Sequence, residues 1–143
     1  DVVYVARIPG RRILSVSLDI GTRLPAYCTS MGRILLGGLA EDELQSFLGQ
    51  AALERRTPNT ITDRRALAAA IGEARTKGFA IVDGELEPGL RSIAAPIRDR
   101  AGGIVAALNV STQSARFSVA EMEREILPVL SDARRRIEEF FVV

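Results

Sequence analysis

The sequence contains no histidine and no tryptophan, and it has a single lysine, Lys77, and a single cysteine, Cys28. The absence of histidine excludes catalytic triads that use histidine as the base and zinc sites built on histidine. A serine–lysine dyad would need Lys77, which lies near the end of an expected helix, where lysine commonly caps carbonyl groups. One cysteine excludes an internal disulfide and fits a reducing compartment, so we expect a cytoplasmic protein.

The net charge is also close to zero, and long apolar runs are missing. The 19 basic and 18 acidic residues give a net charge of +1, so the chain lacks the general electrostatic footprint of a nucleic-acid or membrane binder. The longest apolar runs, such as 34–36 and 104–108, are too short to span a bilayer. The chain opens on the strand-like "DVVYVARIPG", so we expect no signal peptide. Its 143 residues, 47% of them hydrophobic, predict one globular domain.

Hydrophobic patterning predicts strands at both ends of the chain with helices between them. We expect a hairpin of strands 2–7 and 13–18, an extended segment through 19–28, and a helix that Thr29 or Ser30 caps. Further helices are expected at 40–49 and 63–77, followed by strands at 79–85, 90–98 and 103–111. A capping box, Ser118 and Glu121, begins a long final helix that Pro128 should kink or break. This order predicts an α+β fold, an antiparallel sheet with helices packed on it.

One face of the strand within "GELEPGLRSIAAPIRDRAGG" carries almost no bulk. Alternation places Ser92, Ala94 and Pro96 on this face and Ile93 and Ile97 on the other. We expect Ile93, Ile97 and the set formed by Ile104, Ala106, Leu108 and Val110 to lie in the core. The pairing then gathers a small, partly polar face of Ser92, Ala94, Ala107, Asn109 and Ser111. Because interiors are close-packed, this face meets a ligand, a tightly packed helix or solvent, and the pattern leaves these alternatives open.

The start of the helix at "TSMGR" is a second candidate for a binding site. Helix N-termini present unpaired backbone N–H groups and partial positive charge, which suit an anion. Gly32 would let a ligand approach the backbone, Ser30 adds a hydroxyl, and Met31 adds an adaptable apolar wall. The alternative is that Thr29 or Ser30 only caps the helix and that Gly32 only permits tight packing.

Acidic residues alternate in "VDGELEPGLR" and leave an enzyme as the less favoured alternative. Asp83 and Glu85 could act as a general acid and base or hold a metal, but such carboxylates more often pair with arginines, here Arg91. Cys28 lies near a helix N-terminus, which lowers thiol pKa values, yet no base accompanies it. We expect no catalytic residue, no metal and no cofactor.

Two long motifs then carry a family resemblance. "GTRLPAYCTSMGRILLGGL" and "FAIVDGELEPGLRSIAAPIRDRAGGIVAALNVSTQSAR" resemble the C-terminal effector-binding domain of IclR-type transcriptional regulators. The resemblance covers essentially all of residues 1–143. Within the family, "RLPAYCTSMGR" is similar to the PcaR/PcaU/PobR-like branch, which controls protocatechuate, 4-hydroxybenzoate and β-ketoadipate pathways.

The resemblance implies a GAF/PAS-like curved antiparallel sheet flanked by helices, with a pocket for a small carboxylate. "TSMGR" departs from the commoner family pattern "SGxGK", which favours a ligand larger than pyruvate, an aromatic carboxylate or a dicarboxylate derived from it. We expect its carboxylate on the backbone of Met31 and Gly32. Some family members bind zinc in this domain, which the lack of histidine makes unexpected here. The expected ligand-binding residues are Leu24, Tyr27, Ser30, Met31, Gly32, Asp83, Glu85, Arg91, Ser92, Ala94, Asn109 and Ser111.

The resemblance also implies partners. Family members begin with a winged helix-turn-helix, and none precedes Asp1 here, so we expect an excised sensor domain whose operator DNA is bound by the missing N-terminal domain. A small carboxylate effector would reposition the DNA-binding domains through a homodimer or homotetramer, with no membrane involved. An oligomerisation module without a metabolite ligand is the alternative.

Overall fold

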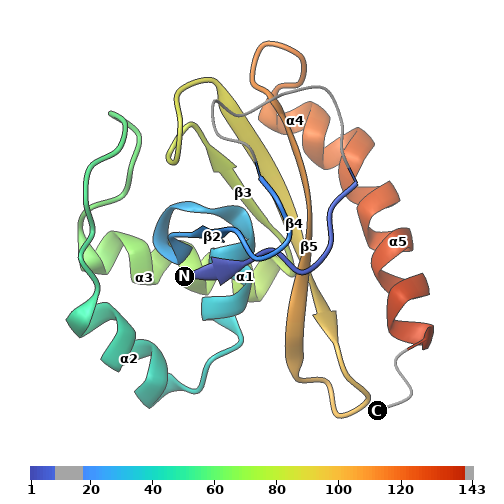
Figure 1. The fold of residues 1–143 in the computed structure, drawn as a ribbon, viewed down its shortest axis with the longest axis horizontal. Helices are drawn as coiled ribbons and strands as arrows, with labels where there is room; N and C mark the ends of the chain where they lie inside the picture. Colours follow the sequence, from blue (N-terminus) through green and yellow to red (C-terminus); the bar gives the residue numbers. More distant parts are fainter. Residues whose placement is uncertain (9–17, 141–143) are drawn as a thin grey trace.

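The structure, a computed structural model, describes residues 1–8 and 18–140. Its centre is a three-stranded antiparallel sheet with helices on both faces (Figure 1). The strands follow the order β3-β4-β5, with β4 in the middle and long β4–β5 pairing: β3 (Ala80–Asp83), β4 (Leu90–Arg98) and β5 (Ile104–Gln113). The predicted α+β fold and the predicted β4–β5 hairpin are therefore confirmed.

The helices divide between the two faces of the sheet. One face is covered by α1 and α3, while α2 lies further out and contacts α3: α1 (Ser30–Gly37), α2 (Glu41–Gln50) and α3 (Arg64–Lys77). The opposite face is covered by the C-terminal helix: α4 (Val119–Glu121), a π-helical turn (Met122–Ile126) and α5 (Leu127–Phe140). The wide turn ends just before Pro128, which lacks the N–H that a regular helix would use there. The helix is therefore irregular before Pro128, but α5 continues through this proline and does not break at it.

Local signals in the sequence fix the helix ends. The Thr29 hydroxyl accepts a hydrogen bond from the backbone N–H of Gly32 and so begins α1. Asp63 caps α3 in the same way, and α3 ends at Gly78, whose φ of 76° suits glycine. The Ser118–Glu121 capping box is also confirmed.

The two faces of the sheet differ as the alternation predicts. Ile93 and Ala95 pack with Met122 and Leu130 beneath the C-terminal helix. On the other face, Ala94 is fully buried in the larger core that α1 and α3 complete. The register sets Ser92 opposite Ser111, Ala94 opposite Asn109 and Pro96 opposite Ala107, which confirms the small, partly polar face. A helix covers the middle of this face, so close packing is one part of the answer that the sequence left open.

Two expectations need correction. A bulge makes Ile97 pair with Ala106 and Arg98 with Ile104, so Val105 is an extra residue. Ile104 therefore turns away from the Ile93 face and packs against the α1 core. Val110, also expected in the core, is exposed.

The predicted strand 2–7 is wrong beyond β1 (Val2–Val3). β1 pairs with β2 (Arg23–Leu24), inside the segment expected to be extended and irregular. Residues 13–17 of that expected hairpin lie outside the described residues. Among the described residues, no helix is long and apolar enough to cross a membrane.

A backbone contact at Gly32 fixes the position of α1. A Cβ added at Gly32 would lie 2.0 Å from the carbonyl oxygen of Ala26, in the short 3₁₀ turn Ala26–Cys28. The first turn of α1 therefore rests directly on backbone, and only glycine fits there.

We predict that Gly32→Ala lowers the free energy of unfolding by at least about 3 kcal/mol, because rigid backbone cannot move aside for the methyl group. Urea denaturation followed by circular dichroism measures the change. Gly72→Ala in α3 is the matched control, since nothing lies within 4 Å of its added Cβ and alanine favours helix by up to about 1 kcal/mol. If the two substitutions changed the free energy of unfolding equally, the close contact between Gly32 and the Ala26 backbone would be contradicted.

Candidate functional site

α1 crosses the small face of the sheet and leaves a hollow at each of its ends. The hollow at the N-terminal end of α1 is a cavity with a volume of about 20 Å³, enough for one water molecule. It lies between the first turn of α1, strands β4 and β5, and the β1–β2 segment. Its lining residues are Tyr4, Leu24, Cys28, Thr29, Ser30, Met31, Val82, Leu86, Leu90, Ser92, Asn109 and Ser111.

Polar groups from two strands converge on this cavity. Ser92 and Ser111 are cross-strand partners, and the Asn109 amide donates a hydrogen bond of 3.1 Å to the Ser111 hydroxyl. The Tyr4 side chain also lines the cavity, and burial raises the pKa of Tyr4, which keeps its phenol neutral at pH 7. These groups form a polar wall opposite the helix.

The first turn of α1 forms the facing wall. Ser30 is 1% exposed, and Met31 is 8% exposed. The backbone N–H of Gly32 already bonds the Thr29 hydroxyl, so the first-turn N–H groups without a partner inside the helix are those of Ser30 and Met31. Their position at the positive end of α1 suits a carboxylate.

The structure brings together half of the residues that the sequence marked as ligand-binding. The cavity is lined by Leu24, Ser30, Met31, Ser92, Asn109 and Ser111. Six others lie outside its lining: Tyr27, Gly32, Asp83, Glu85, Arg91 and Ala94. Tyr27 donates its hydroxyl hydrogen to the carbonyl of Glu54, and Ala94 is covered by α1.

The acidic residues are engaged by arginines. Arg33 and Glu85 form a buried ion pair of 2.5 Å, with side chains that are 6% and 9% exposed. Asp83 pairs with its cross-strand partner Arg91 at 2.9 Å, and Arg91 also donates to backbone carbonyls after β5. Among the described residues, no group of three or more potential ligands could hold a metal ion. The carboxylates therefore tie segments together and leave the cavity wall uncharged.

A second set of contacts fixes the loop after β3. The hydroxyls of Thr57 and Thr60 donate to the carbonyls of Gly84 and Glu85, at 2.5 Å and 2.7 Å. Together with the Arg33–Glu85 pair, these bonds hold the loop that presents Leu86 to the cavity. The sequence shows residues 51–62 only as a loop, and nothing in its pattern reveals this supporting role.

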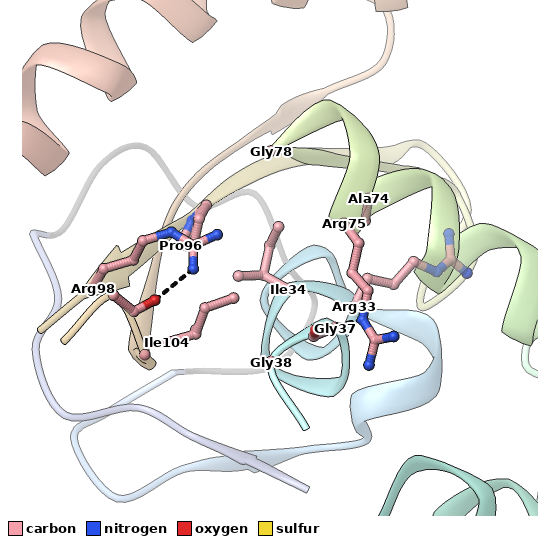
Figure 2. A pocket seen from close by; sticks show the side chains of 12 residues that line it. Arg33, Ile34, Gly37, Gly38, Ala74, Arg75, Gly78, Pro96, Arg98 and Ile104 are labelled. Atoms are coloured by element: carbon pink, nitrogen blue, oxygen red, sulfur yellow. Dashed lines mark hydrogen bonds between the residues drawn. The ribbon is translucent and has the colours of Figure 1, made fainter. Parts of the chain in front are cut away.

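The hollow at the other end of α1 is a larger groove of about 190 Å³ (Figure 2). It lies between the ends of α1 and α3 and the β4–β5 hairpin. Two of its guanidinium groups already bond to carbonyls: Arg75 donates to Gly37 at 2.6 Å, and Arg98 donates to Gly102 at 2.8 Å. The third, Arg33, pairs with Glu85, and its buried Nε has no hydrogen-bond partner. The smaller cavity is the better candidate site despite its volume, because polar side chains converge there beside an apolar wall.

Cys28 contacts the cavity wall but is an unreactive thiol. Its side chain is fully buried, and burial raises its pKa to about 11 from an ordinary value near 9. A neutral thiol without a base is no nucleophile at pH 7, so the structure offers no support for catalysis by Cys28.

Comparison with known proteins decides the family. Residues 1–139 match the family model described as the C-terminal domain of the bacterial transcriptional regulator IclR. The chain belongs to the IclR family. Its relatives in that family are transcriptional regulators and not enzymes.

The curated relatives of the chain are regulatory proteins. The Pca regulon regulatory protein of Pseudomonas putida is 49% identical over 136 residues, which are 94% of this chain and 47% of that protein. The regulator KdgR of Escherichia coli is 35% identical over 137 residues, covering 96% and 52%. The chain thus spans about half the length of these curated relatives.

Solved structures agree with this membership. The crystal structure of the transcriptional regulator RHA06195 from Rhodococcus sp. RHA1 is similar, with a TM-score of 0.91 and 50% identity, covering 96% of this chain and 55% of that protein. A double mutant of the PobR inducer-binding domain from Acinetobacter, solved with 3-hydroxybenzoic acid, has a TM-score of 0.79 and 30% identity, covering 83% and 70%.

Our first prediction for this IclR-type site concerns the buried ion pair. Arg33→Met should lower the free energy of unfolding by about 3–5 kcal/mol, because it strands the Glu85 carboxylate away from water. The double variant Arg33→Met/Glu85→Leu should recover most of the loss, as measured by urea denaturation. Lys77→Met, which breaks the exposed pair with Glu73, is the control and should leave the midpoint nearly unchanged. A double variant as unstable as the single one would argue against a buried charge as the cause.

The second prediction concerns Cys28. Iodoacetamide at pH 8 should leave the native thiol unmodified over a time in which the urea-unfolded chain is labelled fully, as mass spectrometry would show. Since the folded pKa lies above the unfolded one, the protonated thiol favours the fold fully below pH 9, and this contribution is lost as the pH rises to about 11. Cys28→Ala should lose less stability over that range. Rapid labelling of the native chain would contradict the assignment.

Proposed function

We propose that this IclR-type domain binds a small aromatic carboxylate that bears a ring hydroxyl, and that binding controls DNA binding by a separate domain. The observation that carries the proposal is the cavity, where the N-terminus of α1 faces the polar wall of Ser92, Asn109 and Ser111. The similarity to the Pca regulon regulator and to the PobR inducer-binding domain with 3-hydroxybenzoic acid supports this ligand class.

The proposed binding mode uses both walls. The carboxylate lies against the backbone N–H groups of Ser30 and Met31, where the positive end of the helix stabilises it. Asn109 and Ser111 bond the ring hydroxyl, while Met31 and Leu24 contact the ring. The other expected residues hold these walls in place through the contacts described above: Gly32, Ala94, Tyr27, Asp83, Glu85 and Arg91.

The proposed setting is a cytoplasmic homodimer or homotetramer that binds operator DNA through an N-terminal winged helix-turn-helix domain. Support for the additional domain comes from the curated relatives, which are about twice as long and include proteins named HTH-type regulators. An effector can shift such an assembly only by binding one arrangement better than another.

A domain that only assembles copies of the protein is the second candidate. The small volume of the cavity favours it, because about 20 Å³ does not admit an aromatic ring as it stands. It predicts a folded oligomer that binds no metabolite.

Calorimetric titration of the purified chain with 3-hydroxybenzoate, 4-hydroxybenzoate, protocatechuate and β-ketoadipate distinguishes the two candidates. We predict saturable binding of at least one aromatic acid. At a ligand concentration one hundred times Kd, binding should stabilise the fold by about 2.7 kcal/mol and so raise the melting temperature. Ser92→Leu should fill the cavity and abolish binding.

Two further variants make this test specific. If Ser92→Leu unfolds the chain, the smaller change Ser111→Val takes its place and should weaken binding. Ser46→Leu, on the exposed face of α2, is the control and should bind the acid normally. Binding that survives Ser92→Leu would place the ligand elsewhere, and no binding of any acid would favour the assembly candidate.

A further inference from the structure

The cavity must enlarge before it can hold an aromatic ring. An apolar cavity that binds benzene has a volume of about 150 Å³, whereas this one measures about 20 Å³. The missing volume can come from a shift of the backbone around the cavity or from the rearrangement of a side chain in its wall. The contacts of each wall decide between these two routes.

The backbone of the helix wall and of the sheet wall is held firmly. Gly32 rests on the backbone of Ala26, so the first turn of α1 cannot move without losing the contact that positions it. The strands β4 and β5, which carry the polar wall, pair along nearly their whole length. A shift of either wall would therefore break contacts between elements of the fold.

The loop wall and the β1–β2 wall are also anchored. Thr57 and Thr60 donate hydrogen bonds to the loop after β3, and Glu85 of this loop pairs with Arg33. The β1–β2 segment is anchored by Val2, which is 3% exposed and packs in the larger core. Because the backbone is held on every side, a side chain must supply the volume.

Met31 is the side chain best able to do so. Among the described residues that line the cavity, it alone has a long, unbranched apolar side chain. Its three side-chain torsions let the sulfur and the terminal methyl group move while the backbone stays in place. The branched side chains of Leu24 and Leu86 have fewer torsions and move as bulkier groups. A thioether donates no hydrogen bond, so movement of Met31 leaves the polar wall as it is.

Met31 also lies where the ring of the proposed ligand would lie. Its backbone N–H is one of the two that suit the carboxylate, and Asn109 and Ser111 belong to the facing wall. A ring that joins a carboxylate at the first turn of α1 to a hydroxyl at Asn109 therefore passes the Met31 side chain. Thioether sulfur makes favourable contacts with aromatic rings, which an aliphatic acid does not offer.

We propose that Met31 is the specificity-determining residue of the cavity: its side chain fills the space that the ring needs, swings aside to admit an aromatic acid, and limits the size of the acid that fits. This inference rests on the proposed function. A branched side chain at position 31 would restrict the cavity, and a short one would open it permanently.

Calorimetry on variants of the two methionines tests the role of Met31. Met31→Leu keeps the number of side-chain heavy atoms but places a branch beside the ring, so Kd for 3-hydroxybenzoate should rise about tenfold. Met31→Ala removes the obstacle, so the ratio of Kd for 6-hydroxy-2-naphthoate to Kd for 3-hydroxybenzoate should fall at least about tenfold. Met122→Leu is the matched control, because Met122 is buried on the other face of the sheet, and its Kd values should equal those of the unaltered chain.

A second readout follows the Met31 side chain itself. In the chain labelled with [methyl-¹³C]methionine, the signal that is absent from Met31→Leu belongs to Met31, and Met122 supplies an internal reference. Saturating 3-hydroxybenzoate should move the Met31 signal, because the side-chain torsions change and the ring comes to lie against the methyl group. The Met122 signal should stay in place.

The outcomes separate this inference from the proposed function. In a chain that binds 3-hydroxybenzoate, an unmoved Met31 signal or unchanged Kd values in both Met31 variants would overturn the role of Met31 and leave the proposed function standing. Binding of the aromatic acids by Met31→Ala alone would support the role of Met31 and overturn the ligand class proposed for the unaltered chain. Failure of the unaltered chain and of Met31→Ala to bind any of the acids would overturn both.

Discussion

The contact between Gly32 and the backbone of Ala26 is the constraint on which the rest of the structure depends. It seats the first turn of α1 against the chain that precedes it and fixes the line along which the helix crosses the sheet. Ala94 and Ala107 on the facing strands are small enough to let the helix approach. Because α1 covers the middle of this face and not its ends, one hollow remains beside the helix N-terminus and another beside its C-terminus.

Charges hold this arrangement in place, and neutral groups line the candidate site. The Arg33–Glu85 pair joins α1 to the loop after β3, and the Asp83–Arg91 pair joins two strands. In contrast, the cavity presents hydroxyls, an amide and the dipole of a helix. This division suits a domain that binds a small molecule reversibly, and the thiol of Cys28, buried and neutral, adds no nucleophile to it.

Local chemistry accounts for most of what could be predicted from the sequence. Thr29, Asp63 and Gly78 act through bonds to neighbouring residues, so the ends of α1 and α3 follow from their residue types. Long-range effects escaped prediction. The bulge that turns Ile104 to the other face depends on the register of two strands, and the pairing of β1 with β2 involves too few residues to leave a pattern. Tyr4 reaches the cavity only through that pairing, and the partners of Asp83 and Glu85 depend on how the loop folds.

A crystal structure of the chain grown with 3-hydroxybenzoate tests the central claim most directly. The account predicts density for the acid between Met31 and Asn109, with its carboxylate at the first turn of α1. Density in the larger groove between Gly38 and Arg98, with the smaller cavity unchanged, would contradict it.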